Sequence, residues 1–139
     1  MTIEAMGTGL KTRLATIAQL GSNIWAPNEI EAKAPSVFPF AIILQGAVTY
    51  HNTFANAIIV QFRAIILFGL AHQPSSLNRL IDYTERSGGQ SVYAAIDADK
   101  TLGGAADFAV VNSNTGTGST VYAGQNYLST EFAIECQEA

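Results

Sequence analysis

The sequence predicts an α+β domain in which an antiparallel or mixed sheet is built on a long central hairpin, with helices packed on one face. Two apolar runs, Phe40–Tyr50 and Ile58–Gly69, flank the polar segment His51–Asn56. Both runs alternate, and the even positions are mostly apolar, which is the side-chain period of a β-strand. A helical stripe precedes the hairpin, and two helices and three strands are expected after it. The order indicates two layers rather than a repeat or a linked pair of domains.

The second face of this hairpin is also partly apolar. Ile43, Ile59, Ile65 and Leu67 occupy odd positions, beside polar residues such as Arg63. Strands of an antiparallel sheet that face water on one side alternate more cleanly than this. We therefore expect part of the second face to be covered, either by the chain's own helices or by another subunit.

The first helix is expected over Thr2–Leu20, where apolar residues recur at spacings of three or four. A short extended piece, Asn23–Pro27, and a loop, Asn28–Ser36, follow it. Beyond the hairpin, the pattern predicts the following elements: a helix capped by Ser75 or Ser76 with Leu77, Leu80 and Ile81 buried, a short helix capped by Ser91, a strand over Phe108–Asn112, a flexible polar loop over Asn112–Thr120, a short strand over Val121–Gly124, a turn at Gln125 and Asn126, and a last strand over Tyr127–Gln137.

Length and charge narrow the classes of function. The 139 residues fit one domain, 1–139, which buries roughly 68% of its unfolded surface. A net charge of −4 argues against binding of nucleic acid or an anionic membrane through a basic patch. Since only 13% of residues are charged and 48% are hydrophobic, we expect uncharged surface of the kind found in contacts between chains.

The single cysteine, Cys136, excludes an internal disulfide, and its strand parity predicts a buried side chain. The start of the sequence lacks the basic-then-apolar pattern of a signal peptide. Ile58–Ala71 is too short to span a bilayer and contains Arg63. These features predict a soluble protein of a reducing compartment.

No set of residues with catalytic, cofactor-binding or metal-binding spacing emerges. Gly7–Thr12 has the wrong spacing for a phosphate-binding loop and lies within a helical pattern. His51 and His72 lie at opposite ends of one strand, too far apart to share a metal ion. Asp97 and Asp99 are two residues apart on a helix and point in different directions. The sequence therefore predicts a protein without an enzymatic site.

The C-terminal half contains segments that resemble a known family. Asp97–Ala106 is similar to the D-x-T-L-G-G-x-V segment of the tail terminator, or tail completion, proteins of long-tailed bacteriophages, although Ala106 stands where that family more often has valine. Tyr127–Glu135 resembles the closing strand of that family, and Tyr122–Gly124 resembles the small hairpin before it. Arg63–Leu67 resembles its long central strand. The order of elements agrees over most of the chain.

This resemblance implies a structural virion protein at the head–tail junction, made in the cytoplasm of a bacterial host. A ring of six subunits would cap the tail tube, end its growth and dock the head connector. The implied partners are other copies of the chain, the tail tube protein and the head stopper, while DNA passes through the lumen without sequence-specific binding. An acidic lumen would repel phosphate groups and keep the DNA sliding. No membrane or cofactor is implied.

The ring hypothesis predicts residues at the interfaces. Neighbouring subunits are expected to meet near the central hairpin, and the hairpin tip and the preceding loop are expected to point along the ring axis. The residues concerned are His51, Asn52, Thr53, Phe54, Glu29, Glu31, Ile59, Ile65 and Leu67.

Other functions are also compatible with the sequence. Another neck connector, a stopper or an adaptor, would share most of these features. A small-ligand-binding α+β domain would need a closed apolar pocket with convergent polar groups. A small enzyme would need a site that the sequence does not display.

Overall fold

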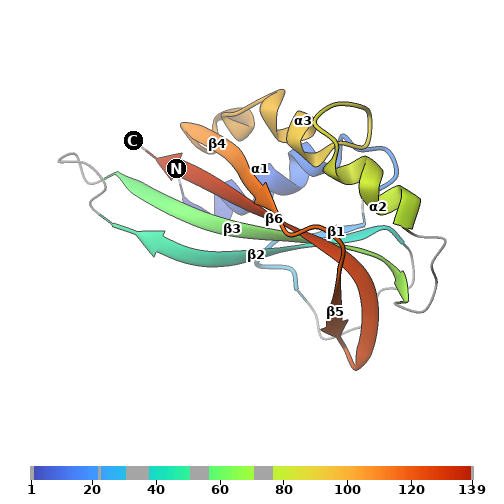
Figure 1. Ribbon diagram of the computed structural model, residues 1–139. Coiled ribbons are helices and arrows are strands. Elements are labelled where there is room, and N and C mark those ends of the chain that lie inside the picture. Colours follow the sequence, from blue (N-terminus) through green and yellow to red (C-terminus); the bar gives the residue numbers. More distant parts are fainter. Residues whose placement is uncertain (1, 22, 31–37, 51–56, 71–76, 139) are drawn as a thin grey trace.

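The chain folds into one mixed sheet with its helices on one face (Figure 1), which confirms the α+β class. The structure is a computed structural model that describes residues 2–21, 23–30, 38–50, 57–70 and 77–138. The strand order is β1-β2-β3-β6-β4, and β5 pairs with β6 off this path. Only the β1–β2 pair is parallel among the described strands.

The elements follow one another along the chain in this order: α1 (Ile3–Leu14), β1 (Ile24–Trp25), β2 (Phe40–Thr49), β3 (Ile58–Leu70), α2 (Leu77–Thr84), α3 (Val92–Asp97), the 3₁₀ turn η2 (Leu102–Gly104), β4 (Phe108–Asn114), β5 (Gly118–Tyr122) and β6 (Gln125–Glu138). The hairpin tip and the serines expected to cap α2 lie outside the described residues.

Helix α1 begins as expected but ends early. The Thr2 hydroxyl accepts a hydrogen bond from the Ala5 N–H at 3.0 Å, which satisfies one of the free donors of the first turn. The predicted end at Leu20 is wrong, because after Leu14 the chain continues in tight turns. Ile17 and Leu20 are nevertheless buried, so the apolar stripe continues through a backbone that is no longer α-helical.

Two glycines let α1 pack closely on its neighbours. A Cβ atom on Gly7 would lie 2.8 Å from Pro27 Cδ, and one on Gly9 would lie 2.8 Å from Leu102 Cβ. Glycine weakens a helix by about 1 kcal/mol relative to alanine. In α1 this loss of helix stability is linked to close packing on Pro27 and Leu102, because any larger residue would require these neighbours to move.

The main core lies between the helices and one face of the sheet. The predicted parity holds in β3 and β6, where Phe62, Ile66 and Phe132 are all buried in this core. It is wrong in the first part of β2, because Ile43, rather than Leu44, faces the helices. A register shift between Gln45 and Val48 then returns the even positions to the core face. One extra residue in a strand moves all the side chains that follow it to the opposite face of the sheet.

The second face carries its own apolar cluster at one end of the sheet. Phe40, Ile42, Ile65, Leu67 and Tyr127 form its buried part. The side chains packed against this cluster come from the strand β1 and its following loop, from the start of β2, and from β5; they are Trp25, Ile30, Phe38, Leu44 and Tyr122. Here the chain covers the second face with its own residues, which are not helical.

The sheet curls at this end so that its two margins meet. The ring of Trp25, on β1, lies 4.8 Å from that of Phe40 and 6.0 Å from that of Tyr122, on β5. These are distances at which aromatic edges and faces attract. Figure 1 shows β5 and the first part of β6 bending away from the rest of the sheet. The curl closes one end of the sheet and leaves the other open.

The predicted flexible loop over Asn112–Thr120 is wrong. Residues up to Asn114 continue β4, and β5 begins at Gly118; both strands pair with β6. The side-chain amide of Asn114 donates to the Thr130 hydroxyl at 2.7 Å, and the Thr130 hydroxyl donates to the Gly116 carbonyl at 2.9 Å. The short connection is thus fixed by polar side chains.

The last hairpin turns earlier than expected. Ala123 and Gly124 have φ values of 50° and 80°, and β6 already starts at Gln125. Positive φ at both central residues is typical of the two-residue turns that match the twist of a hairpin. The predicted turn at Gln125 and Asn126 is therefore wrong by two residues.

The predicted inward face of α2 is partly wrong. Ile81 is exposed, whereas Tyr83 is buried and its ring lies 5.1 Å from that of Phe68. Leu80 is buried as expected. The following helix, α3, matches its prediction, since Ser91 caps it and Val92 packs into the core.

Candidate functional site

The described residues hold few groups suited to chemistry. No cluster of three or more histidine, cysteine or acidic side chains that could hold a metal ion occurs among them. Cys136 is buried in the core as expected, and burial, followed by the charge of Glu135, raises the pKa of its thiol to about 12. Since the thiolate is the reactive form, this cysteine is inert near neutral pH. His51 and His72 lie outside the described residues.

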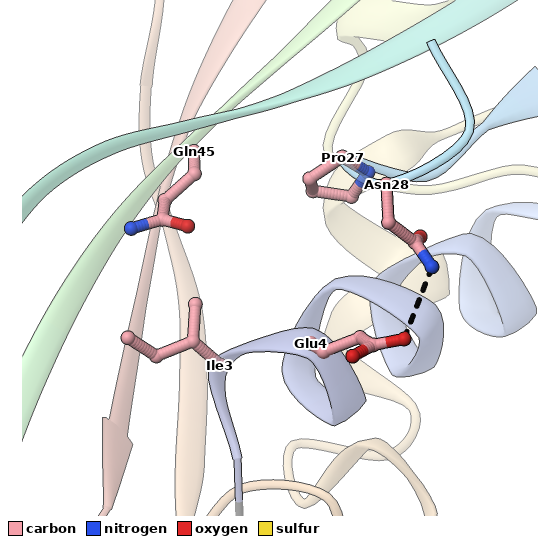
Figure 2. Close-up of a pocket in the computed structure, with 5 residues that line it drawn as sticks. All are labelled: Ile3, Glu4, Pro27, Asn28 and Gln45. Carbon is pink, nitrogen blue, oxygen red and sulfur yellow. Dashed lines mark hydrogen bonds between the residues drawn. The ribbon is translucent and has the colours of Figure 1, made fainter.

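The surface has several hollows, one of which is shown in Figure 2. It has a volume of about 210 Å³ and lies between the start of α1 and the outer side of β2. Glu4 accepts a hydrogen bond from the Asn28 amide at 3.1 Å, and Ile3 and Gln45 form the opposite wall. The polar groups bind each other, so this hollow does not present the convergent set expected of a ligand site.

Two further hollows flank Tyr93, between β4 and the helices. One, of about 330 Å³, lies beside Thr84 and Arg86, and the other, of about 270 Å³, lies beside Asp97 and Lys100. Residues of β4, including Asn112, line the strand side of both hollows, and Phe132 of β6 also lines the first. Together they form a groove along the outer side of β4, which we call the β4 groove.

The predicted interface residues fall in four different settings, of which that of Glu29 is described in the next paragraph. His51, Asn52, Thr53, Phe54 and Glu31 lie outside the described residues. Leu67 and Ile65 are buried in the second apolar cluster, with exposed fractions of 0% and 7%, so within this chain they present almost no surface to a partner. Ile59 is half-buried and keeps part of its side chain accessible.

Glu29 has a role within the chain. Its carboxylate accepts hydrogen bonds from the Ala26 N–H at 3.0 Å and from Lys11 Nζ at 2.7 Å. The hydrogen bond from Lys11, followed by that from Ala26, lowers the pKa of Glu29. This carboxylate fixes the turn after β1 against α1, although its side chain remains partly exposed.

The segment Asp97–Ala106 forms a tight turn organised by Asp99. This carboxylate accepts hydrogen bonds from the Thr101 hydroxyl at 2.7 Å, the Thr101 N–H at 3.2 Å and the Gly103 N–H at 3.0 Å. Leu102 has a φ of 52°, and its side chain is buried at the position where Gly9 leaves room for it. The turn thereby attaches the region after α3 to α1.

The hydrogen bond from the Thr101 hydroxyl is the main cause that lowers the pKa of Asp99. A carboxyl whose pKa is depressed by folding stabilises the protein above its unfolded pKa of about 4, and that contribution is lost as the pH falls through the folded pKa. We expect Asp99→Asn to lower the urea midpoint at pH 7, and we expect this difference to shrink as the pH falls from 7 through the folded pKa of Asp99, because the native side chain then becomes neutral as well. Urea melts across this range test it; a difference that does not change with pH would contradict it.

The two margins of the open end of the sheet carry no charge. The outer side of β2 from Leu44 to Thr49 and the outer side of β4 pair with no other described strand. Neither stretch contains a charged residue or a proline. Natural proteins usually protect exposed edge strands with such residues, because free N–H and C=O groups are a template for another strand. We call these two stretches the β2 edge and the β4 edge.

Two exposed large apolar side chains, Tyr50 and Phe108, lie at these margins. Tyr50, directly after β2, is 67% exposed, and Phe108 at the start of β4 and Val121 on β5 are also exposed. Ile81 on α2 is the fourth such residue in the described part of the chain.

Sequence reasoning missed this site because it assigned Asn112–Thr120 to a loop. The usable signal was the absence of charge: no Asp, Glu, Lys or Arg occurs from Phe108 to Gln125.

None of the helices in the described ranges has the length and apolar character needed to cross a membrane.

Comparisons with known proteins do not identify a family for this chain. No family model matches the chain, and the search of curated proteins found no match either.

Proposed function

We propose that this chain is a structural subunit that forms a ring at the head–tail junction of a long-tailed bacteriophage. The ring caps the tail tube, ends its growth and provides the docking surface for the head connector. By the family resemblance, six copies close the ring, and its partners are the tail tube protein and the head stopper.

The observation that carries the proposal is the pair of uncharged edges on opposite margins of one sheet. A ring of identical subunits needs two unlike patches on each copy, joined head to tail. The β2 edge and the β4 edge are such a pair. The Asp99 turn, which contains the segment most similar to the tail terminator family, supports the same assignment.

Charge supports the proposal in a second way. A net charge of −4 disfavours retention of DNA on the protein, as a channel that DNA must traverse requires. The few charged groups on β3 and β6 include the pair Arg63 and Glu131, whose atoms lie 2.6 Å apart. Exposed pairs of this kind contribute at most about 1 kcal/mol, so a partner's charges can replace either member with little loss of stability.

The purified protein and purified tail tubes test the proposal. We expect the protein to assemble into a ring measurable by its mass, to bind one end of preformed tubes, and to stop further addition of tube subunits. A monomer that leaves tube growth unchanged would contradict the proposal. A monomer that instead binds a metabolite would favour a small-ligand-binding domain.

A further inference from the structure

We propose that neighbouring copies of this chain join by pairing the β4 edge of one subunit with the β2 edge of the next, so that their sheets continue into one another. This inference rests on the proposed function for its ring, and it specifies which two strands form the contact. The occupant of the β4 groove is thus a second copy of the chain.

Strand direction favours this pairing. The four strands β2, β3, β6 and β4 are successively antiparallel. When the sheet is continued sideways with the helices kept on the same face, the β2 strand of the next copy runs antiparallel to β4. Antiparallel pairing has the better hydrogen-bond geometry of the two possibilities.

The two edges also lie at the same level of the sheet. Two rows of paired residues connect their ends: Thr49, Ile59, Gln137 and Phe108 form one row, and Leu44, Arg63, Ala133 and Ser113 form the other. The edges therefore have matching lengths. Each also carries one register shift, between Gln45 and Val48 and between Val111 and Ser113, and Gln45 and Val111 belong to one row.

The β2 edge directs backbone donors outward. Ala41 donates its N–H to the carbonyl oxygen of Asn23, directly before β1, at the outer side of β2. Donors alternate between the two sides of a strand, so the N–H groups of Ile43 and Gln45 also point to the outer side. Beyond Ile42, no described strand accepts from that side.

Opposite charges flank the two edges on the helical face. Glu4 lies across the hollow from Gln45 of the β2 edge, and Arg86 lines the β4 groove together with Val111. Neither has an ion-pair partner among the described residues; Glu4 accepts from Asn28, and Arg86 lies over the ring of Tyr93 at 6.0 Å. Joining the two edges brings the Glu4 carboxylate of one copy and the Arg86 guanidinium of the next to the same side of the contact between the subunits, where they attract each other.

Complementary edge variants test the pairing. Asn112→Glu places a negative charge in the β4 groove, where the pairing would bring the Glu4 carboxylate of the next copy, and leaves the β2 edge intact. Gln45→Pro removes an outward donor and leaves the β4 edge intact. We expect each variant alone to be monomeric at concentrations where the native protein assembles. Mixed together, they should form a dimer with one copy of each, because one intact edge of each kind remains. Mass measurement of the separate and mixed proteins reads this out.

Matched controls keep the test decisive. Thr12→Glu adds the same charge at an exposed position on α1 and should assemble as the native protein does. If circular dichroism shows that Gln45→Pro is unfolded, Thr49→Lys on the same edge replaces it. A mixture that stays monomeric, a single variant that still assembles, or a native chain that never assembles would overturn the pairing.

The outcomes for the pairing and for the proposed function are separable. A mixed dimer together with native protein that leaves tail tubes unaffected supports the pairing and contradicts the function. Native protein that stops tube growth, together with variants that do not pair, supports the function and contradicts this pairing.

Discussion

Phe62→Ala is expected to lower the free energy of unfolding by about 3–5 kcal/mol. Phe62 is 1% exposed and lies in the main core, on β3, between the strands β2 and β6. Its ring packs in the region where α1 approaches the sheet, and a Cβ atom on Gly7 would lie 3.8 Å from it. Removing the ring leaves a cavity between two layers that the rigid sheet cannot close.

Denaturant melts at a concentration where both proteins are monomeric measure this loss, since assembly would add a concentration-dependent contribution. Phe108→Ala provides the matched control, because this phenylalanine is exposed at the end of β4. It should cost about 1 kcal/mol or less. Equal effects for the two variants would show that the face assigned to β3 is wrong.

Leu67→Ala is expected to cost about 2–5 kcal/mol, and the loss should not depend on protein concentration. Leu67 is fully buried in the second apolar cluster of its own chain. Its pairing partners are Phe40 on β2 and Ser129 on β6, so it lies in the middle of the sheet rather than at an edge. This result would assign Leu67 to folding and not to the contact between subunits.

Ile59→Ala serves as the comparison, since this residue lies on the same face but is only half-buried. It should destabilise the monomer less than Leu67→Ala does. Melts at several protein concentrations distinguish the two roles. A Leu67→Ala loss that appears only where the native protein assembles would place this leucine in the subunit contact instead.

The sequence was most informative where one period extends without interruption. In β3 the even positions from Val60 to Phe68 are all buried, as the alternation predicts. The same holds for Phe132, Ile134 and Cys136 in β6. A strand in the centre of a sheet has both neighbours and one core face, so its pattern is fixed by burial alone.

The sequence was less informative where a change in backbone geometry alters which side chains point to the core. The shift in β2 occurs at Gly46, where a Cβ atom would lie 2.9 Å from the Gln61 carbonyl oxygen. A glycine within a strand indicates a bulge or a close approach, but it does not say which side of the strand keeps the expected parity. In α2, Ile81 and Tyr83 are both apolar enough to face inward, and only the aromatic contact with Phe68 decides between them.

The candidate site could be predicted only in part. The apolar second face correctly indicated surface that needs cover, and at one end the chain's own strands and loops provide it. The contact between chains that the low charge predicts stays a prediction. The open edges could not be predicted, because they depend on the pairing of β4 with β6, and β4 lacks a clean alternation. The alternation of residues in a strand indicates which of its faces is buried, but it does not indicate which strands pair and which edges stay unpaired.

Electron microscopy of tails from a phage that lacks this chain tests the central claim most directly. If the chain forms the terminal ring, such particles should contain tails of uncontrolled length, or finished tails that do not join heads, and added native protein should restore joining. Particles with tails of normal length attached to heads would contradict the account.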